Sequence, residues 1–196
     1  MILANTIPSN VLLSSRLLSA EDASTLSTEL AHHSQLVSSE IIGLDLPARN
    51  RVESLLQNEF LDEHQLRELA CEFVEHTLHI YEEQAPRDRH PHQCVEAARQ
   101  YLAGAGIEGL QAAIKETIPA VWQLHGTVLI AAFEAGMAAT FLDYHDAAEM
   151  ARVVTQHTQR AAHRKEWECR KSDLELMIGR EKEATWQLTR IVEILA

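Results

Sequence analysis

Hydrophobic and polar positions alternate with a helical period in the segment that follows an expected joint at residues 58–62. Spacings of three and four place one set of positions on a single buried stripe, namely Leu66, Leu69, Phe73, His76 and Ile80. The positions on the opposite side are almost wholly acidic, namely Glu68, Glu72, Glu75, His79 and Glu82. The pattern predicts a helix with one face in the core and one acidic face in solvent.

A charged turn is expected to end this helix. It reads Gln84-Ala-Pro-Arg-Asp-Arg-His-Pro91. Pro91 fits the first turn of a new helix, because the backbone nitrogens there have no partner within the helix. Val95, Ala98 and Leu102 then fall on one side of that new helix. Two helices are therefore expected to meet at a charged corner.

The N-terminal part of the chain predicts further helices. A helix of about residues 20–40 is expected to follow a capping box, and helix-forming sequence resumes at about Ala48. We therefore expect peripheral N-terminal helices in residues 1–60 and a main helical domain in residues 61–196, within one compact unit.

Residues 117–142 contain one charged residue, Glu134. Polar residues and Pro119 interrupt this run, so it does not reach the roughly 18 to 20 strongly apolar residues of a membrane-spanning helix. Pro119 marks either a kink or a fresh helix start. We interpret the run as a nearly charge-free central helix that is buried on most sides.

The last segment, from Arg164 to Leu195, predicts a long amphipathic helix with charges of both signs outside its apolar stripe. An unbroken helix of this length would extend roughly 48 Å, which exceeds what a compact domain of this size easily covers. We therefore expect the segment either to break near Gly179 or to project and form a homodimer with a second copy.

Composition supports an all-α fold. Seven glycines and five prolines in 196 residues are too few for the tight turns of an all-β chain, while Ala, Leu, Glu, Gln and Arg dominate the long segments. We expect a multi-helix bundle of about seven to nine helices.

Net charge indicates what kind of partner the protein can bind, and cysteine content indicates in which compartment it acts. The chain holds 29 acidic residues against 17 lysines and arginines, a net charge of −12. This field repels nucleic acid and anionic membranes and attracts basic partners, and it serves solubility equally well. Three cysteines without a C-x-x-C motif, and an N-terminus without the basic start of a secretory signal, predict a cytoplasmic protein.

The corner carries a family resemblance. An acidic helix end, a Pro-x-Asp-Arg-x-Pro turn and a following helix of the type (I/V)EAAR-x-(W/Y)L occur together. The matching residues are Tyr81, Glu82, Glu83, Pro86, Asp88, Arg89, Pro91, Val95, Glu96, Ala97, Ala98, Arg99, Tyr101 and Leu102. This combination resembles the alanine-rich, all-helical immunity proteins of bacterial polymorphic toxin systems, and a looser likeness continues to about residue 155. The resemblance implies a protein that binds and neutralises a cognate toxin domain.

We expect the acidic helix face to meet a basic surface on the toxin and to block access of its substrate, because an acidic protein can imitate the phosphate backbone electrostatically. The expected partner-binding residues are Glu72, Glu75, His79, Glu82, Glu83 and Asp88. Pro86, Arg89 and Pro91 are expected to shape the corner, with Arg87 and Arg89 paired to its acids. The alternative is a solvated helix face that meets no partner.

A metal-dependent helical-bundle enzyme is an alternative from another class. His76 and His79 lie one turn apart, and a residue such as His125, Glu134 or His145 would complete a site. However, the stripe pattern places His76 in the core and His79 on the acidic face, so the two side chains diverge. We therefore expect no metal ion and no other cofactor.

The remaining candidate groups have structural explanations. His90 and His92 lie at a helix N-terminus, which disfavours a cation, and a carboxylate such as Glu134 in an apolar helix needs an Arg or His partner. No G-x-S-x-G, G-x-x-x-x-G-K-[ST] or H-E-x-x-H motif occurs. The sequence thus favours a binding protein over an enzyme. A dimerisation or adaptor module built on the C-terminal segment is a further alternative.

Overall fold

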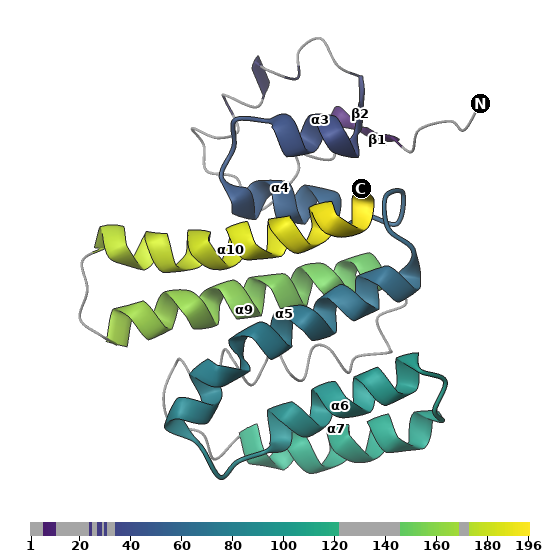
Figure 1. Cartoon of the computed structure of the whole chain (residues 1–196), viewed down its shortest axis with the longest axis vertical. Helices are drawn as coiled ribbons and strands as arrows, with labels where there is room; N and C mark the ends of the chain where they lie inside the picture. Colours follow the sequence, from purple (N-terminus) through teal and green to yellow (C-terminus); the bar gives the residue numbers. More distant parts are fainter. Residues whose placement is uncertain are drawn as a thin grey trace.

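The computed structural model describes residues 6–10, 24, 27–28, 30, 34–121, 146–168 and 173–196. Within these residues seven helices and two short strands can be traced, so the predicted all-α fold is confirmed (Figure 1). The helices are α3 (Ser38–Gly43), α4 (Ala48–Leu55), α5 (Glu63–Gln84), α6 (His90–Leu102), α7 (Ile107–Val121), α9 (Ala147–Glu168) and α10 (Asp173–Leu195). The strands are β1 (Thr6–Pro8) and β2 (Gln35–Val37).

The N-terminal part of the chain forms a two-stranded ribbon. β1 pairs antiparallel with β2, and Ile7 lies opposite Leu36, with both side chains buried. The helix predicted for residues 20–40 is therefore wrong at its C-terminal end, because Gln35–Val37 is a strand and α3 begins only at Ser38. The strand depends on pairing with a distant segment, which a local helical period does not report.

Helix α5 lies at the centre of the contacts between helices. It packs against α9 and α6, while α6 packs against α7, and α10 packs against both α9 and α4 (Figure 1). One continuous core includes Ile7 of β1, Val52 of α4, Phe73 of α5 and Ile191 of α10. Residues on both sides of position 60 contribute to this core, and the division of the chain at that position stays a prediction.

Helices α9 and α10 lie side by side as two separate helices (Figure 1). The break predicted near Gly179 is wrong in its position, because Gly179 is buried inside α10, while α9 ends at Glu168 and α10 begins at Asp173. A glycine in a helix interior costs about 1 kcal/mol relative to alanine, which is too little to end a helix that packs against both α9 and α4.

Helix α7 runs through Pro119 to Val121, so Pro119 does not begin a fresh helix. The rest of the predicted central helix, including Glu134, lies outside the described residues. In the part of the chain that the structure describes, no helix is both long enough and apolar enough to cross a bilayer.

Phe73 tests the central position of α5. Its side chain is fully buried, and its ring meets the Trp186 ring of α10 edge-on with 6.0 Å between centroids. Phe73→Ala is expected to lower the free energy of unfolding by about 3–5 kcal/mol, because the neighbouring helices cannot fill the cavity. Urea denaturation measures this loss, and Ile107→Ala on the exposed side of α7 is the control, with an expected change of less than about 1 kcal/mol. An equally small loss for Phe73→Ala would contradict a core built around α5.

Candidate partner-binding face on helix α5

Helix α5 begins with a reciprocal cap. The Asp62 carboxylate accepts a hydrogen bond from the backbone N–H of Gln65 at 2.8 Å, and the Gln65 side-chain oxygen accepts one from the Asp62 N–H at 2.9 Å. This capping box satisfies backbone donors that have no partner within the helix. The helix then runs for 22 residues and carries the whole predicted acidic face.

Ion pairs connect the acids of α5 to three neighbouring helices. The pairs are Glu72 with Arg190 of α10 at 3.0 Å, Glu75 with Arg99 of α6 at 2.9 Å, and Glu83 with Lys165 of α9 at 2.9 Å. Arg99 donates a second hydrogen bond to Glu75 at 3.1 Å, which makes that pair bidentate. Partly exposed pairs of this kind contribute little to stability. Their main effect is to hold the acidic side chains in fixed positions.

Glu82 differs from these acids. Its side chain is exposed, and its carboxylate forms no ion pair or hydrogen bond with any residue that the structure describes. It lies near the C-terminal end of α5, where the helix dipole is negative and no basic residue lies in the last turn. The Glu82 carboxylate therefore has no charged or hydrogen-bonding partner among the described residues and is available to a cation.

The structure places His76 at the surface. Its side chain is 39 % exposed, so its prediction as a core residue is wrong, although the expected hydrogen-bond partner exists. His76 Nδ1 lies 2.9 Å from Oε2 of Glu183, and the imidazole stacks on Trp186 with 3.7 Å between centroids and 5° between planes. His76 lies at the edge of the buried stripe, and this edge faces α10. The helical period alone does not decide on which side an edge position falls.

Glu183 leads into a buried polar network between α9 and α10. Its side chain is 5 % exposed and accepts a hydrogen bond from Gln187 Nε2 at 3.1 Å in addition to the contact with His76. Gln187 also donates to Thr158 at 2.8 Å and accepts from Gln159 at 3.0 Å. The buried carboxylate is thus satisfied, as burial requires. Sequence reasoning missed this network, and its only local signal is a Glu and a Gln four positions apart on the inner face of α10.

His76 and His79 do not converge on one point. His79 Nδ1 lies 2.9 Å from the backbone oxygen of His76, to which it donates as the N–H tautomer, whereas His76 Nδ1 faces Glu183. No group of three or more metal-ligating side chains occurs among the described residues. The residues that were expected to complete a metal site lie outside the residues that the structure describes, namely His125, Glu134 and His145.

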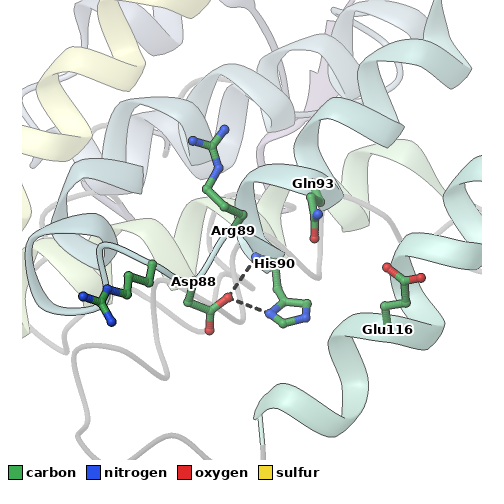
Figure 2. Close-up of a pocket in the computed structure, with 6 residues that line it drawn as sticks. Asp88, Arg89, His90, Gln93 and Glu116 are labelled. Atoms are coloured by element: carbon green, nitrogen blue, oxygen red, sulfur yellow. Dashed lines mark hydrogen bonds and ion pairs between the residues drawn. The ribbon is translucent and has the colours of Figure 1, made fainter.

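Asp88 connects the two helices of the corner. Its carboxylate accepts a hydrogen bond from the Tyr81 hydroxyl at 2.6 Å. It also accepts one from the backbone N–H of His90 at 2.9 Å, and His90 Nδ1 lies 2.6 Å from it (Figure 2). Partial burial acts to raise the pKa of Asp88, but the hydrogen bonds together outweigh it, so the net pKa is below the ordinary value. Burial, and then the bond to Asp88, raise the pKa of the Tyr81 phenol. An ionised Asp88 and a neutral Tyr81 therefore hold the corner.

The corner arginines do not pair with its acids, so that prediction is wrong. Arg87 and Arg89 are exposed and form no ion pair with any described residue, and the Asp88 carboxylate is held by Tyr81 and His90 instead. Arg89 directly precedes α6, and its side chain points away from the His90 ring (Figure 2). An open pocket of about 510 Å³ lies at this corner and is lined by Arg87, Asp88, Arg89, His90, Gln93 and Glu116.

The prolines and the other histidine of the corner have structural positions. Pro91 is buried in the first turn of α6, which confirms its predicted place. Pro86 is exposed in the turn, and His92 is partly buried on α6.

The cysteines near the face are buried free thiols. Burial raises the pKa of the Cys71 thiol to about 12, and burial also raises the pKa of Cys94. Both thiols are therefore protonated at neutral pH and are poor nucleophiles. Cys169 lies outside the described residues.

The fold and the site together define an all-α protein with an acidic, ion-paired helix face beside a hydrogen-bonded corner. The model of the Imm-5 like putative immunity protein family matches residues 57–114. This range contains all of α5, the corner and α6, so it confirms the family resemblance over the segment that carries it. The match suggests an immunity role and favours a non-enzymatic protein. No curated protein and no solved structure gives a significant match.

The pH dependence of stability tests the corner. Asp88→Asn is expected to lower the free energy of unfolding by about 2 kcal/mol at neutral pH, because hydrogen bonds to a charged acceptor are lost. Folding lowers the pKa of Asp88, so this difference is fully present above about pH 4 and disappears as the pH falls through the folded pKa.

Urea denaturation measures the difference in free energy of unfolding between wild type and Asp88→Asn, once at neutral pH and once at about pH 3. Asp45→Asn, at an exposed acid, is the control and is expected to leave the free energy of unfolding unchanged at both pH values. If the difference between wild type and Asp88→Asn stayed constant down to the acidic point, the ionised carboxylate would not be what holds the corner.

Proposed function

We propose that this protein is an immunity protein that binds a cognate bacterial toxin domain and neutralises it. The observation that carries the proposal is the family match, which covers the acidic helix and the corner together. The proposed binding residues are Glu72, Glu75, His79, Glu82, Glu83 and Asp88. The protein acts in the cytoplasm by occupying a surface of the toxin, without catalysis and without a cofactor.

Charge supports a basic surface as the binding site on the toxin. The chain carries a net charge of −12, which accelerates encounter with a basic partner. Of the proposed binding acids, Glu72, Glu75 and Glu83 already have partners in the chain, so they contribute orientation and partly neutralised charge. Asp88 is occupied by Tyr81 and His90, and its contribution to binding is the weakest of the set.

Glu82 is the acid that best fits a binding role. It is exposed, it has no ion pair in the described part of the chain, and its position near the negative end of α5 opposes the helix dipole. An exposed residue that slightly destabilises the fold is a good candidate for binding a partner, because binding sites often have lower local stability than the rest of a protein.

Self-association through α10 is a second mode of binding that we keep as a proposal. α9 and α4 cover much of this helix within one chain, but Ile178 is 42 % exposed on it. A second copy could cover that side chain.

Co-expression tests the proposed function. The partner is the C-terminal domain of the large secreted protein expected from the neighbouring upstream gene, produced in a bacterial host with and without this chain. Survival of the host and co-purification of a complex are expected only when both chains are present. Continued toxicity without a complex, for a domain that is toxic alone, would refute the proposal.

Charge reversal at Glu82 tests the binding face. Glu82→Lys is expected to weaken binding of the toxin domain by at least about tenfold, mainly through a slower association rate, because like charges then meet. The same change should leave thermal stability equal or slightly higher, since it places a cation near the C-terminal end of α5.

Glu59→Lys is the matched control, because Glu59 is exposed before the opposite end of α5 and should leave the association rate nearly unchanged. Surface plasmon resonance at two salt concentrations measures both variants. Equal association rates for wild type and Glu82→Lys would remove this end of the helix from the interface.

A further inference from the structure

Two aromatic rings lie beside the acidic face of α5, at the edge where this helix faces α10. The imidazole of His76 stacks on the indole of Trp186, with 3.7 Å between centroids and 5° between planes. The His76 side chain is 39 % exposed, and Trp186 is only partly buried against the core. A planar, partly apolar surface therefore lies among carboxylates.

Buried side chains fix the positions of the two rings of this stack. Glu183 is buried and bonds His76 Nδ1 at 2.9 Å, which fixes the plane of the imidazole. Phe73 packs edge-on against Trp186, with 6.0 Å between centroids and 70° between planes. Neither ring can turn without losing a buried contact, so binding to this surface costs little side-chain entropy.

The charges that α5 carries on either side of the stack are mainly negative. Glu72 and Glu75 precede His76 along the helix, and Glu82 and Glu83 follow it toward the C-terminal end. Three cations beside the face are paired with these acids, namely Arg190, Arg99 and Lys165, and a fourth, the exposed Lys182, lies one turn before Trp186 on α10. The four acids of α5 and the buried Glu183 still outnumber these four cations, so the remaining charge of the site favours a cation supplied by a partner.

An arginine fits this surface better than a lysine does. A guanidinium is planar, so it can stack on an aromatic ring and donate hydrogen bonds to a carboxylate at the same time. Rigid aromatic contacts surrounded by polar groups are also typical of the residues that dominate binding energy at protein interfaces.

We propose that the His76 and Trp186 stack is the central contact of the partner-binding face and receives an arginine side chain of the toxin domain. The inference rests on the proposed function and adds to it the residues and the chemistry of the contact. The acids set the association rate, whereas the stack sets the lifetime of the complex.

Dissociation kinetics test the inference with the same toxin domain as the probe. His76→Gln retains an amide donor for Glu183 but removes the aromatic ring, and Trp186→Phe retains a ring that can contact Phe73. Each is expected to raise the dissociation rate by about tenfold with little change in the association rate. His64→Ala, at an exposed histidine in the first turn of α5, is the control and should leave both rates unchanged.

A double-mutant cycle identifies the arginine. Each arginine of the toxin domain is replaced by alanine and measured against wild type and His76→Gln. One arginine replacement should weaken binding to the wild-type protein by about tenfold. The same replacement should weaken binding to His76→Gln by clearly less, because that variant already lacks the ring that the arginine contacts. Thermal unfolding of each variant confirms that it is folded before the rates are compared.

The outcomes separate the two proposals. A wild-type complex whose dissociation rate is unchanged in both folded variants would overturn the inference and leave the immunity function standing. Faster dissociation without coupling to any arginine would overturn the assigned chemistry of the contact. If the wild-type protein formed no complex, both proposals would fail together.

Discussion

The packing of α5 against α9 and α6 is the interaction on which the bundle depends, because it outweighs the negative charge along this helix. Glu68, Glu72 and Glu75 follow one another at spacings of three and four, and like charges at these spacings destabilise an isolated helix. The helix nevertheless extends over 22 residues, because its other face is buried against α9 and α6 and tertiary packing supplies most helical stability. Ion pairs from α6, α9 and α10 offset part of the remaining repulsion. The helix that fills the core thus also presents the charged surface.

Local signals predicted the region around the corner, because caps, turns and helical periods act over one or two turns. The placement of Pro91 in the first turn of α6 is an example. The pairing of Ile7 with Leu36 depends on segments far apart in the sequence, and no local window reports it. The persistence of α10 through Gly179 likewise depends on packing against another helix, which outweighs the preference of a single glycine.

The candidate site was less accessible to prediction than the fold. The helical period identified which side of α5 is acidic, but the cations that pair with it come from three other helices. His76 lies at the edge of the buried stripe, where the period permits either assignment, and the polar edge of α10 decides between them. Trp186 belongs to that distant helix, so no pattern within α5 indicates the stack.

The buried amides between α9 and α10 have a consequence for the outer surface. Gln187 contacts both Gln159 and Thr158, and sliding one helix past the other by a turn would separate these groups and leave them without partners. An interface made only of leucines would allow α9 and α10 to pack in several axial registers. The hydrogen bonds of Gln187 allow only one. The alignment fixes how far along the bundle axis Trp186 stands, and hence whether it meets His76 at all. The buried hydrogen bonds between α9 and α10 therefore determine the position of the exposed stack of His76 and Trp186.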